Sequence, residues 1–215
     1  MSQTYVVQAG DYMETIAEKF GFRDYHIIYD DPNNSHIKKF RPNPHILYPG
    51  DRVFIPDMDP GHEPADTDKK HKFVLKAQKI KLILYIRRNG EPFAKKAYKL
   101  KIGAQTIAGK TGDDGLIEQQ IPIGEPLGEL TFAGPPQYTR KLNFGFLHPI
   151  SKNSGRQMRL NNLGFGCGPP TGDESDTYDA AVRAFQRRNR LTLTGKFNDH
   201  TLDKLRSEYD HDVPS

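Results

Sequence analysis

Residues 47–56 read LYPGDRVFIP, a tight turn followed by four strand residues and a closing proline. Pro49 presets the first central position of the turn and Gly50 tolerates a positive φ, so the chain reverses just before the strand. Upstream, residues 5–11 read YVVQAGD, a short strand that also ends at a glycine turn. Residues 13–29 place apolar side chains at helical spacing, first in METIAEKF, which a glycine follows, and then in HIIY. Residues 1–56 therefore predict the order strand, helix, helix, strand.

This segment resembles a LysM domain through YVV-x-x-GD at 5–11, IA-x-x-FG at 16–21 and L-x-PGD-x-V-x-IP at 47–56. The resemblance implies that glycans containing N-acetylglucosamine bind between the first strand–helix loop and the loop before the last strand. Such loops can offer backbone hydrogen bonds to acetamido groups and apolar contact to sugar faces. The implied glycan-binding residues are Gly10, Asp11, Tyr12, Met13, Pro44, His45, Ile46, Leu47 and Tyr48.

Two departures from the LysM pattern keep a second interpretation open. Tyr12 stands where a small hydroxyl residue is usual, so its ring could stack on a sugar or block the groove. We expect Tyr12 to be a loop aromatic that provides contact rather than core packing. Residues 30–43 are longer than in a minimal LysM domain. A structural or protein-binding role therefore stands beside glycan binding.

A linker at residues 57–72 separates this unit from a β-patterned segment at residues 73–150. IKLILYI at 80–86 ends at an Asn-Gly turn, and further short strands are expected at 97–102, 116–121, 129–132 and 141–146. Evenly spaced short strands predict a small β-sandwich. NGEPF at 89–93 and TGDDG at 111–115 resemble carboxypeptidase-regulatory-like, prealbumin-type sandwich domains.

Residues 151–215 are predicted to be helical. They read Q-x-x-L-x-x-LGF at 157–165, AV-x-x-FQ at 181–186 and L-x-x-TG-x-F-x-x-x-TL-x-x-L at 191–205. These motifs resemble the three-helix peptidoglycan-binding domain found beside many wall hydrolases. TGDESD at 171–176 departs from the usual Asp-Gly-x-Phe-Gly of that family, which bears on glycan contacts by this loop. The predicted fold class is thus multidomain α+β.

Bulk properties restrict the partners and the compartment. The 215 residues carry a formal net charge of +4, with 31 basic residues interleaved among 27 acids, which lacks the concentrated basic patch of a nucleic-acid-binding protein. No apolar run approaches the ~20 residues of a membrane span. Cys167 is the single cysteine, so no internal disulfide forms. The N-terminus lacks the pattern of an export signal, and synthesis in the cytoplasm is expected.

Residues typical of catalysis do not form a convincing constellation in the sequence. Cys167 follows His148, but the Ser or Thr expected before a transpeptidase Gly-Cys pair is absent, so an inert loop cysteine is favoured. The histidines and acids of residues 62–71 lie in the linker rather than on regular structure, which disfavours a metal site. The turn acids of the predicted sandwich single out no carboxylate pair. We expect no enzymatic activity and no cofactor.

The extended first segment, with DPNN at 31–34 and RPNPHILYPGDRVFIP at 41–56, resembles LysM proteins of type VI secretion and related contractile injection systems. The resemblance implies a peptidoglycan-binding accessory protein that a secretion machine delivers to the periplasm. Its partners would be peptidoglycan or a chitooligosaccharide-like glycan, and spike or toxin proteins. Two alternatives are an adaptor that docks a spike or toxin without binding glycan and an undetected cell-wall hydrolase.

Overall fold

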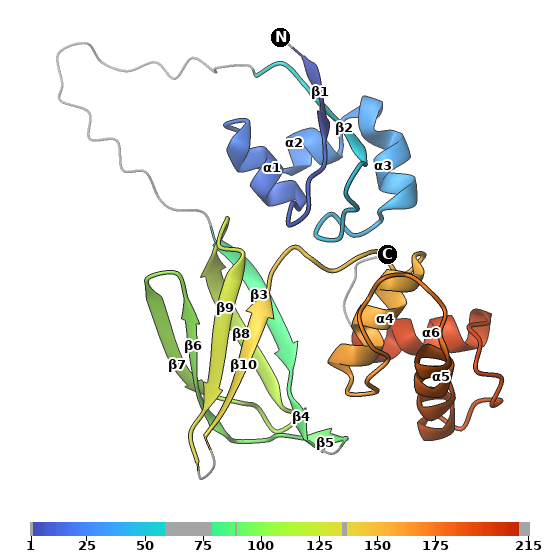
Figure 1. Ribbon diagram of the computed structural model, residues 1–215. Coiled ribbons are helices and arrows are strands. Elements are labelled where there is room, and N and C mark those ends of the chain that lie inside the picture. The colour runs from blue at the N-terminus through green and yellow to red at the C-terminus, as the bar shows by residue number, and fades with distance from the viewer. Residues whose placement is uncertain (1, 59–78, 89, 135–136, 211–215) are drawn as a thin grey trace. The chain divides into compact units, whose positions relative to one another are not determined.

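The computed structural model describes residues 2–58, 79–88, 90–134 and 137–210 and divides the chain into two compact units (Figure 1). Unit 1 combines Met1–Asp57 with Gly145–Ser215, and unit 2 is Met58–Phe144. The mixture of helices and small sheets agrees with the predicted α+β class. Most of the predicted linker, residues 59–72, lies outside the described residues. Residues 145–150, expected at the end of the sandwich, belong to unit 1.

The N-terminal module, residues 2–57 of unit 1, pairs its two strands and places its helices between them in sequence. The strands β1 (Gln3–Val6) and β2 (Arg52–Ile55) are antiparallel. Gly10 and Gly50 both have a φ of +94°, which confirms the two glycine turns. The long 30–43 segment contains two elements that the sequence did not predict. The helices in chain order are α1 (Met13–Lys19), α2 (His26–Tyr29), the 3-10 helix η1 (Pro32–Asn34) and α3 (Ser35–Phe40).

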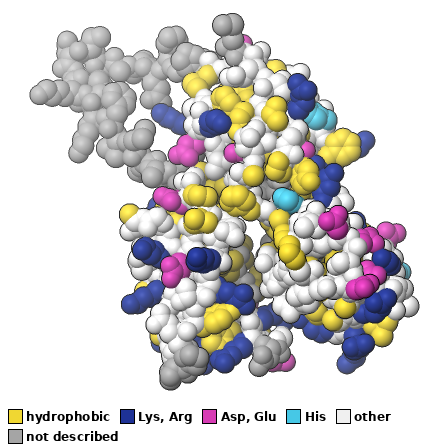
Figure 2. All heavy atoms as spheres, in the orientation of Figure 1, with side chains coloured by type: hydrophobic (Ala, Val, Ile, Leu, Met, Phe, Trp, Pro, Cys, Tyr) yellow, Lys and Arg dark blue, Asp and Glu magenta, His cyan; other side chains and the backbone are white. Residues whose placement is uncertain are grey.

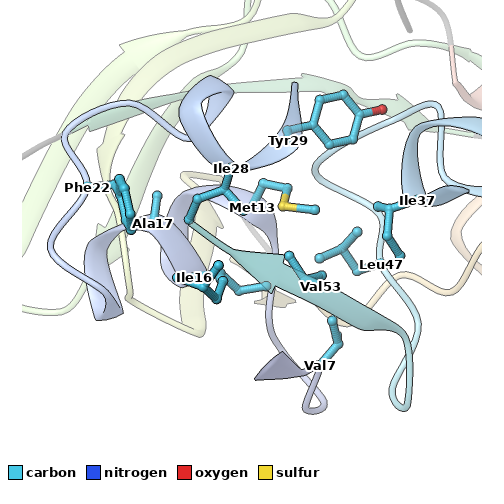
Figure 3. Close-up of a cluster of buried hydrophobic side chains, with 11 residues drawn as sticks. Val7, Met13, Ile16, Ala17, Phe22, Ile28, Tyr29, Ile37, Leu47 and Val53 are labelled. Carbon is cyan, nitrogen blue, oxygen red and sulfur yellow. The ribbon is translucent and has the colours of Figure 1, made fainter. Parts of the chain in front are cut away.

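A single apolar cluster holds the N-terminal module together (Figure 3). Met13, Ile16 and Ala17 of α1 point into it and are at most 1% exposed, as the helical spacing predicts. Val53 and Ile55 enter from β2. Asn34 is fully buried, and its side-chain amide donates to the carbonyl oxygens of Ile28 and Phe54 while its oxygen accepts from the Phe54 N–H. The extra 3-10 turn is therefore fastened to β2 through a satisfied buried amide.

Unit 2 contains a four-stranded antiparallel sheet in the order β10-β9-β6-β7 and a two-stranded sheet of β3 and β8. The inner side chains of β6, Tyr98, Leu100 and Ile102, are buried and alternate with exposed residues. One apolar cluster takes residues from both sheets. The strands are β3 (Lys79–Tyr85), β4 (Arg87–Arg88), β5 (Glu91–Pro92), β6 (Ala97–Ile102), β7 (Gln105–Lys110), β8 (Leu116–Pro122), β9 (Leu127–Phe132) and β10 (Tyr138–Asn143).

Two strands of unit 2 differ from the sequence prediction. β7 was not expected, because QTIAGK offers only one large apolar residue and contains a glycine. Gly109 is required there, since a Cβ at this position would lie 2.7 Å from the hydroxyl oxygen of Tyr98. The last strand, expected at 141–146, ends at Asn143. Gly145 has a φ of +76°, a conformation outside the extended region, which explains the earlier end.

The C-terminal domain, residues 145–210 of unit 1, contains three helices around their own apolar cluster (Figure 1). They are α4 (Asn153–Asn162), α5 (Asp176–Arg188) and α6 (Asp199–Tyr209). Ser175 and Asn198 cap α5 and α6 by accepting a hydrogen bond from the backbone N–H three residues on. Leu160, Val182, Phe185 and Leu205 are fully buried at the centre. The three helices fall where the sequence predicted them.

Candidate functional site

The two loops implied by the LysM resemblance lie side by side in the structure. We call Gly10–Met13 and Pro44–Tyr48 the loop pair. The Met13 N–H donates to the Pro44 carbonyl oxygen over 3.1 Å, which ties one loop to the other. Beside this bond, the imidazole Nδ1 of His45 lies 3.0 Å from the Glu14 carboxylate. The structure thus brings together two stretches that are well separated in the sequence.

Burial separates the scaffold of the loop pair from its surface. Met13 is 0% exposed, Leu47 is 3% exposed, and both belong to the apolar core of the module. Both therefore support the loops from the core. The surface positions, which are half-buried or exposed, are Gly10, Asp11, Pro44, His45, Ile46 and Tyr48.

Tyr12 is a core residue in this structure. It is 7% exposed and precedes α1 in extended backbone, where its N–H donates to Thr15 Oγ1 over 3.0 Å and its carbonyl accepts from the same hydroxyl. The expectation of a loop aromatic that provides contact rather than core packing is wrong. One physical reason is that Gly145, which the LysM pattern does not describe, lies against the ring: a Cβ at position 145 would be 3.0 Å from Tyr12 Cδ1.

The carboxylates of the two glycine turns are used internally. Asp11 Oδ2 accepts from the Tyr5 hydroxyl and from the Gln8 N–H, both at 2.7 Å. Asp51 pairs with the Arg41 guanidinium through two bonds of 2.7 and 2.9 Å and also accepts from the Tyr48 N–H. These bonds shape the turns, and a glycan at the loop pair would meet backbone groups and rings more than free carboxylates.

Two buried glutamines fix the loops of the C-terminal domain. Gln157 donates to the Asp173 carbonyl and accepts from the Gly172 N–H, each at 2.8 Å, so the unusual 171–176 loop is held firmly against α4. Gln186 accepts from the Gly195 N–H at 3.0 Å and donates to the Lys196 carbonyl oxygen at 3.0 Å. Both loops are positioned by satisfied buried amides, and rigid loops are suitable for recognition.

Polar and aromatic side chains of α4, α5 and these loops contact one another. The Arg156 guanidinium stands 5.4 Å from the ring centroid of Phe197, and Phe197 stacks on Tyr178 at 6.2 Å. Lys196 Nζ is 2.7 Å from Glu174 and 3.1 Å from Asp179. Burial raises the pKa of Tyr178 to about 12, so this ring stays neutral. We call Arg156, Lys196 and Phe197 the C-terminal surface. It combines a guanidinium on an aromatic ring with a lysine that is paired to two carboxylates.

Cys167 is part of the interior of the C-terminal domain. It is 2% exposed, and its Sγ donates to the Gln157 carbonyl oxygen and to Asn161 Oδ1 at 3.2 and 3.3 Å. Burial raises the pKa of its thiol, which disfavours the thiolate that nucleophilic chemistry needs. His148 has a different hydrogen-bond partner, Ser154 Oγ at 2.8 Å.

The described part of the chain holds no cluster of three or more metal-ligating side chains. The linker histidines and acids at 62–71 lie outside it. Among the helices of the described ranges, none combines the length and the apolar character of a membrane span. Figure 2 shows basic and acidic side chains intermixed over the visible face, in agreement with the charge pattern of the sequence.

Comparison with known families identifies the type of the C-terminal domain. Residues 156–205 match the family described as putative peptidoglycan binding domain. The match spans most of α4, all of α5 and the first half of α6. Searches of curated proteins and of solved structures found no match. The C-terminal domain is therefore of a peptidoglycan-binding type, as its motifs predicted, and it points to a cell-wall glycan as partner.

Sequence reasoning placed every site residue in the loop pair and none in the C-terminal domain. The C-terminal surface draws on residues from distant parts of the domain, so no local motif joins Arg156 to Phe197. One signal was present: the glutamines of the motifs at 157–165 and 181–186 are polar residues on helical faces that are otherwise apolar. A buried amide at such a position usually fastens a neighbouring loop.

Proposed function

We propose that this protein is a non-enzymatic accessory protein that binds peptidoglycan through its C-terminal domain. The observation that carries the proposal is the family match at residues 156–205. Its support from the structure is the C-terminal surface, where Arg156 stands over the ring of Phe197 and Lys196 precedes Phe197 in the chain. Stem-peptide carboxylates would compete with Glu174 and Asp179 for Lys196, and a sugar would pack against the part of the Phe197 ring that Tyr178 and Arg156 leave open.

The buried state of Cys167 and its hydrogen bonds within the fold support a role without thiol catalysis. The wider setting of the proposal is a type VI or related contractile secretion system that delivers the protein to the periplasm. Its support is the order of the three segments and the extended form of the first one, both of which resemble LysM proteins of such systems. In that setting the N-terminal module is of LysM type and a spike or toxin protein is a second partner.

A second candidate function is a protein-interaction adaptor, and one observation favours it. The loop pair is already in contact with polypeptide, because Gly145, Phe146 and His148 line the same pocket as Gly10 and Leu47. A surface that accepts a peptide segment of its own chain has the shape and chemistry to accept one from another protein.

Co-sedimentation with purified peptidoglycan sacculi tests the main proposal. We expect the full chain to pellet with sacculi at micromolar concentration, and we expect no release of soluble muropeptides above a boiled-protein control. Protein that stays in the supernatant while circular dichroism shows it folded would contradict binding. Muropeptide release that Cys167→Ser abolishes would show that the protein is a hydrolase.

A matched pair of lysines tests the C-terminal surface. Lys196 and Lys204 are both partly exposed and ion-paired, but Lys196 stands beside Phe197 whereas Lys204 lies on α6 and pairs with Glu208. We expect Lys196→Gln to weaken sacculus binding several-fold, and Lys204→Gln to leave it nearly unchanged. Equal effects of the two substitutions would move the binding site away from Phe197.

A further inference from the structure

The segment Gly145–His148, here called the inner segment, lies directly against the loop pair. Gly145 approaches so closely that a Cβ would clash with the carbonyl oxygen of Gly10 and come within 3.0 Å of the Tyr12 ring. The next side chain, Phe146, places its ring 3.2 Å from where a Cβ at Gly10 would be. A side chain at position 145 would break this contact, and one at position 10 would press against the Phe146 ring.

Helix α4 of the C-terminal domain also holds the inner segment in place. The His148 carbonyl accepts from Arg159 Nη1 over 2.8 Å, and the imidazole Nδ1 is 2.8 Å from Ser154 Oγ. On its other side, the imidazole packs edge-on against Tyr48 of the loop pair, with ring centroids 5.1 Å apart. Lys152 adds a cation 5.0 Å from the same tyrosine ring. The segment is thus bonded to α4 on one side and packed against the loop pair on the other.

Little space remains where these parts meet. The cavity lined by the loop pair and the inner segment has a volume of about 10 Å³, room for roughly one water molecule. Ligand pockets typically offer ~300–1,000 Å³. Phe146 and His148 border this cavity together with Gly10, Asp11 and Leu47. A glycan that used Gly10, Asp11 and Leu47 together would first have to displace the inner segment.

We propose that the inner segment is an intramolecular occupant of the loop pair, and that a glycan and this segment compete for the same site. The inference rests on the proposed function, because it assigns a glycan ligand to the loop pair of a peptidoglycan-binding protein. The chain would then engage peptidoglycan first through its C-terminal domain, and the N-terminal module would bind only after the inner segment leaves. The apparent association constant of the loop pair is its intrinsic value multiplied by the fraction of molecules in which the segment is displaced.

Two variants release the segment by different means. Gly145→Val adds a side chain that clashes with Gly10 and strains a backbone with φ of +76°. Phe146→Ala removes the ring that covers Gly10, and its side chain is 40% exposed, so the fold tolerates the change. Gly164→Val is the matched control, because Gly164 has a φ of +90° but no atom lies within 4 Å of an added Cβ.

The measurement is the affinity of the full chain for an N-acetylglucosamine pentamer, by isothermal titration calorimetry. We expect Gly145→Val and Phe146→Ala to bind at least about tenfold more tightly than the parent, while Gly164→Val binds like the parent. Should Gly145→Val fail to fold, Phe146→Ala decides alone. Equal affinity in all four proteins, or no binding in any of them, would overturn the inference. Sacculus binding by the parent is scored separately, so failure of this inference and failure of the proposed function are distinguishable.

A second readout reports the segment itself. The chain contains no tryptophan, so Phe146→Trp introduces a single tryptophan against Gly10, whose emission can be excited selectively above the tyrosine absorption. We expect the pentamer to shift its emission to longer wavelength as the indole moves into water. Leu193→Trp, at a position that is 50% exposed, is the control and should not respond. If the pentamer binds the Phe146→Trp variant without changing its emission, the glycan enters without displacing the segment, against the proposal.

Discussion

The two ends of unit 1 hold their loops in different ways. In the C-terminal domain, buried Gln157 and Gln186 fasten loops whose charged side chains, such as Lys196, remain exposed to solvent. In the N-terminal module, the loop pair packs against the inner segment, which leaves about 10 Å³ between them. The difference teaches that the same chain can position one set of loops by buried amides and cover another with its own polypeptide.

The largest expected effect concerns the buried ion pair of the C-terminal domain. Arg159 and Asp210 have side chains that are 2% and 7% exposed, and their closest charged atoms are 3.0 Å apart. Asp210→Asn leaves a buried guanidinium without its counter-charge, so we expect a loss of about 3–5 kcal/mol in the free energy of unfolding. Urea unfolding of the C-terminal domain, followed by amide resonances, measures it.

The control for this change is another aspartate of α6. Asp203 pairs with Arg206 across one helical turn and is 70% exposed. Asp203→Asn should change the free energy of unfolding by less than about 0.5 kcal/mol. A similar loss in both variants would mean that the buried pair is not what stabilises this end of the unit.

The N-terminal module is expected to depend on apolar packing instead. Ile16 is 0% exposed in its core, and Ile16→Ala should lower the free energy of unfolding by about 2–5 kcal/mol. Ile27, which is 52% exposed, is the matched control, and Ile27→Ala should have little effect. Chemical denaturation followed by a probe in the module measures the free energy of unfolding of both variants. Comparable losses in Ile16→Ala and Ile27→Ala would place the core elsewhere.

Two glycine turns of the N-terminal module differ in whether the inner segment lies against them. Gly10 and Gly50 share a φ of +94°, but an added Cβ meets Phe146 at Gly10 and nothing at Gly50. Both alanine variants should lose about 1–3 kcal/mol from backbone strain. Gly10→Ala should lose roughly 1 kcal/mol more, through overpacking.

A double-mutant cycle that combines Gly10→Ala with Phe146→Ala isolates the extra loss of Gly10→Ala in the free energy of unfolding. We expect the excess to vanish once the ring is gone. An excess that persists in the Phe146→Ala background would assign it to the turn and not to the inner segment.

How far the sequence predicted this molecule depends on the range of the interactions. Glycine turns, helical spacing and caps are local, and they placed β1, α1, β2 and the three C-terminal helices correctly. The extra η1 and α3 escaped, because the contacts that anchor them are distant in sequence: Asn34 bonds to Phe54, 20 residues away, and Ile37 packs in the core of the module. β7 escaped because an edge strand with one large apolar residue depends on its partner, β6.

The candidate site shows the same limit. The loop pair could be proposed from motifs, since each loop is a contiguous stretch. The burial of Tyr12 and the inner segment could not, because Gly145 and Gly10 stand far apart in the sequence and neither glycine signals its partner. The C-terminal surface likewise joins separate loops, so only the fold brings its residues together.

The smallest expected effect is a pH dependence at the inner segment. Burial lowers the pKa of His148 below its ordinary value of 6.5, so the folded state binds fewer protons at this site than the unfolded chain. Stability from this group is complete above pH 6.5 and falls as the pH drops below it. The decrease between about pH 7.5 and 5.5 should shrink in His148→Gln. His200→Gln, at an exposed position, should retain it, and identical decreases in all three proteins would exclude His148 as the cause.

The most direct test of the central claim is a titration of the isotope-labelled full chain with soluble peptidoglycan fragments, followed by amide chemical shifts. The account predicts changes within residues 156–205, centred on Arg156, Lys196 and Phe197, with the loop pair nearly silent in the parent protein. Changes confined to Gly10–Met13 and Pro44–Tyr48, or no changes at all in a folded protein, would contradict it.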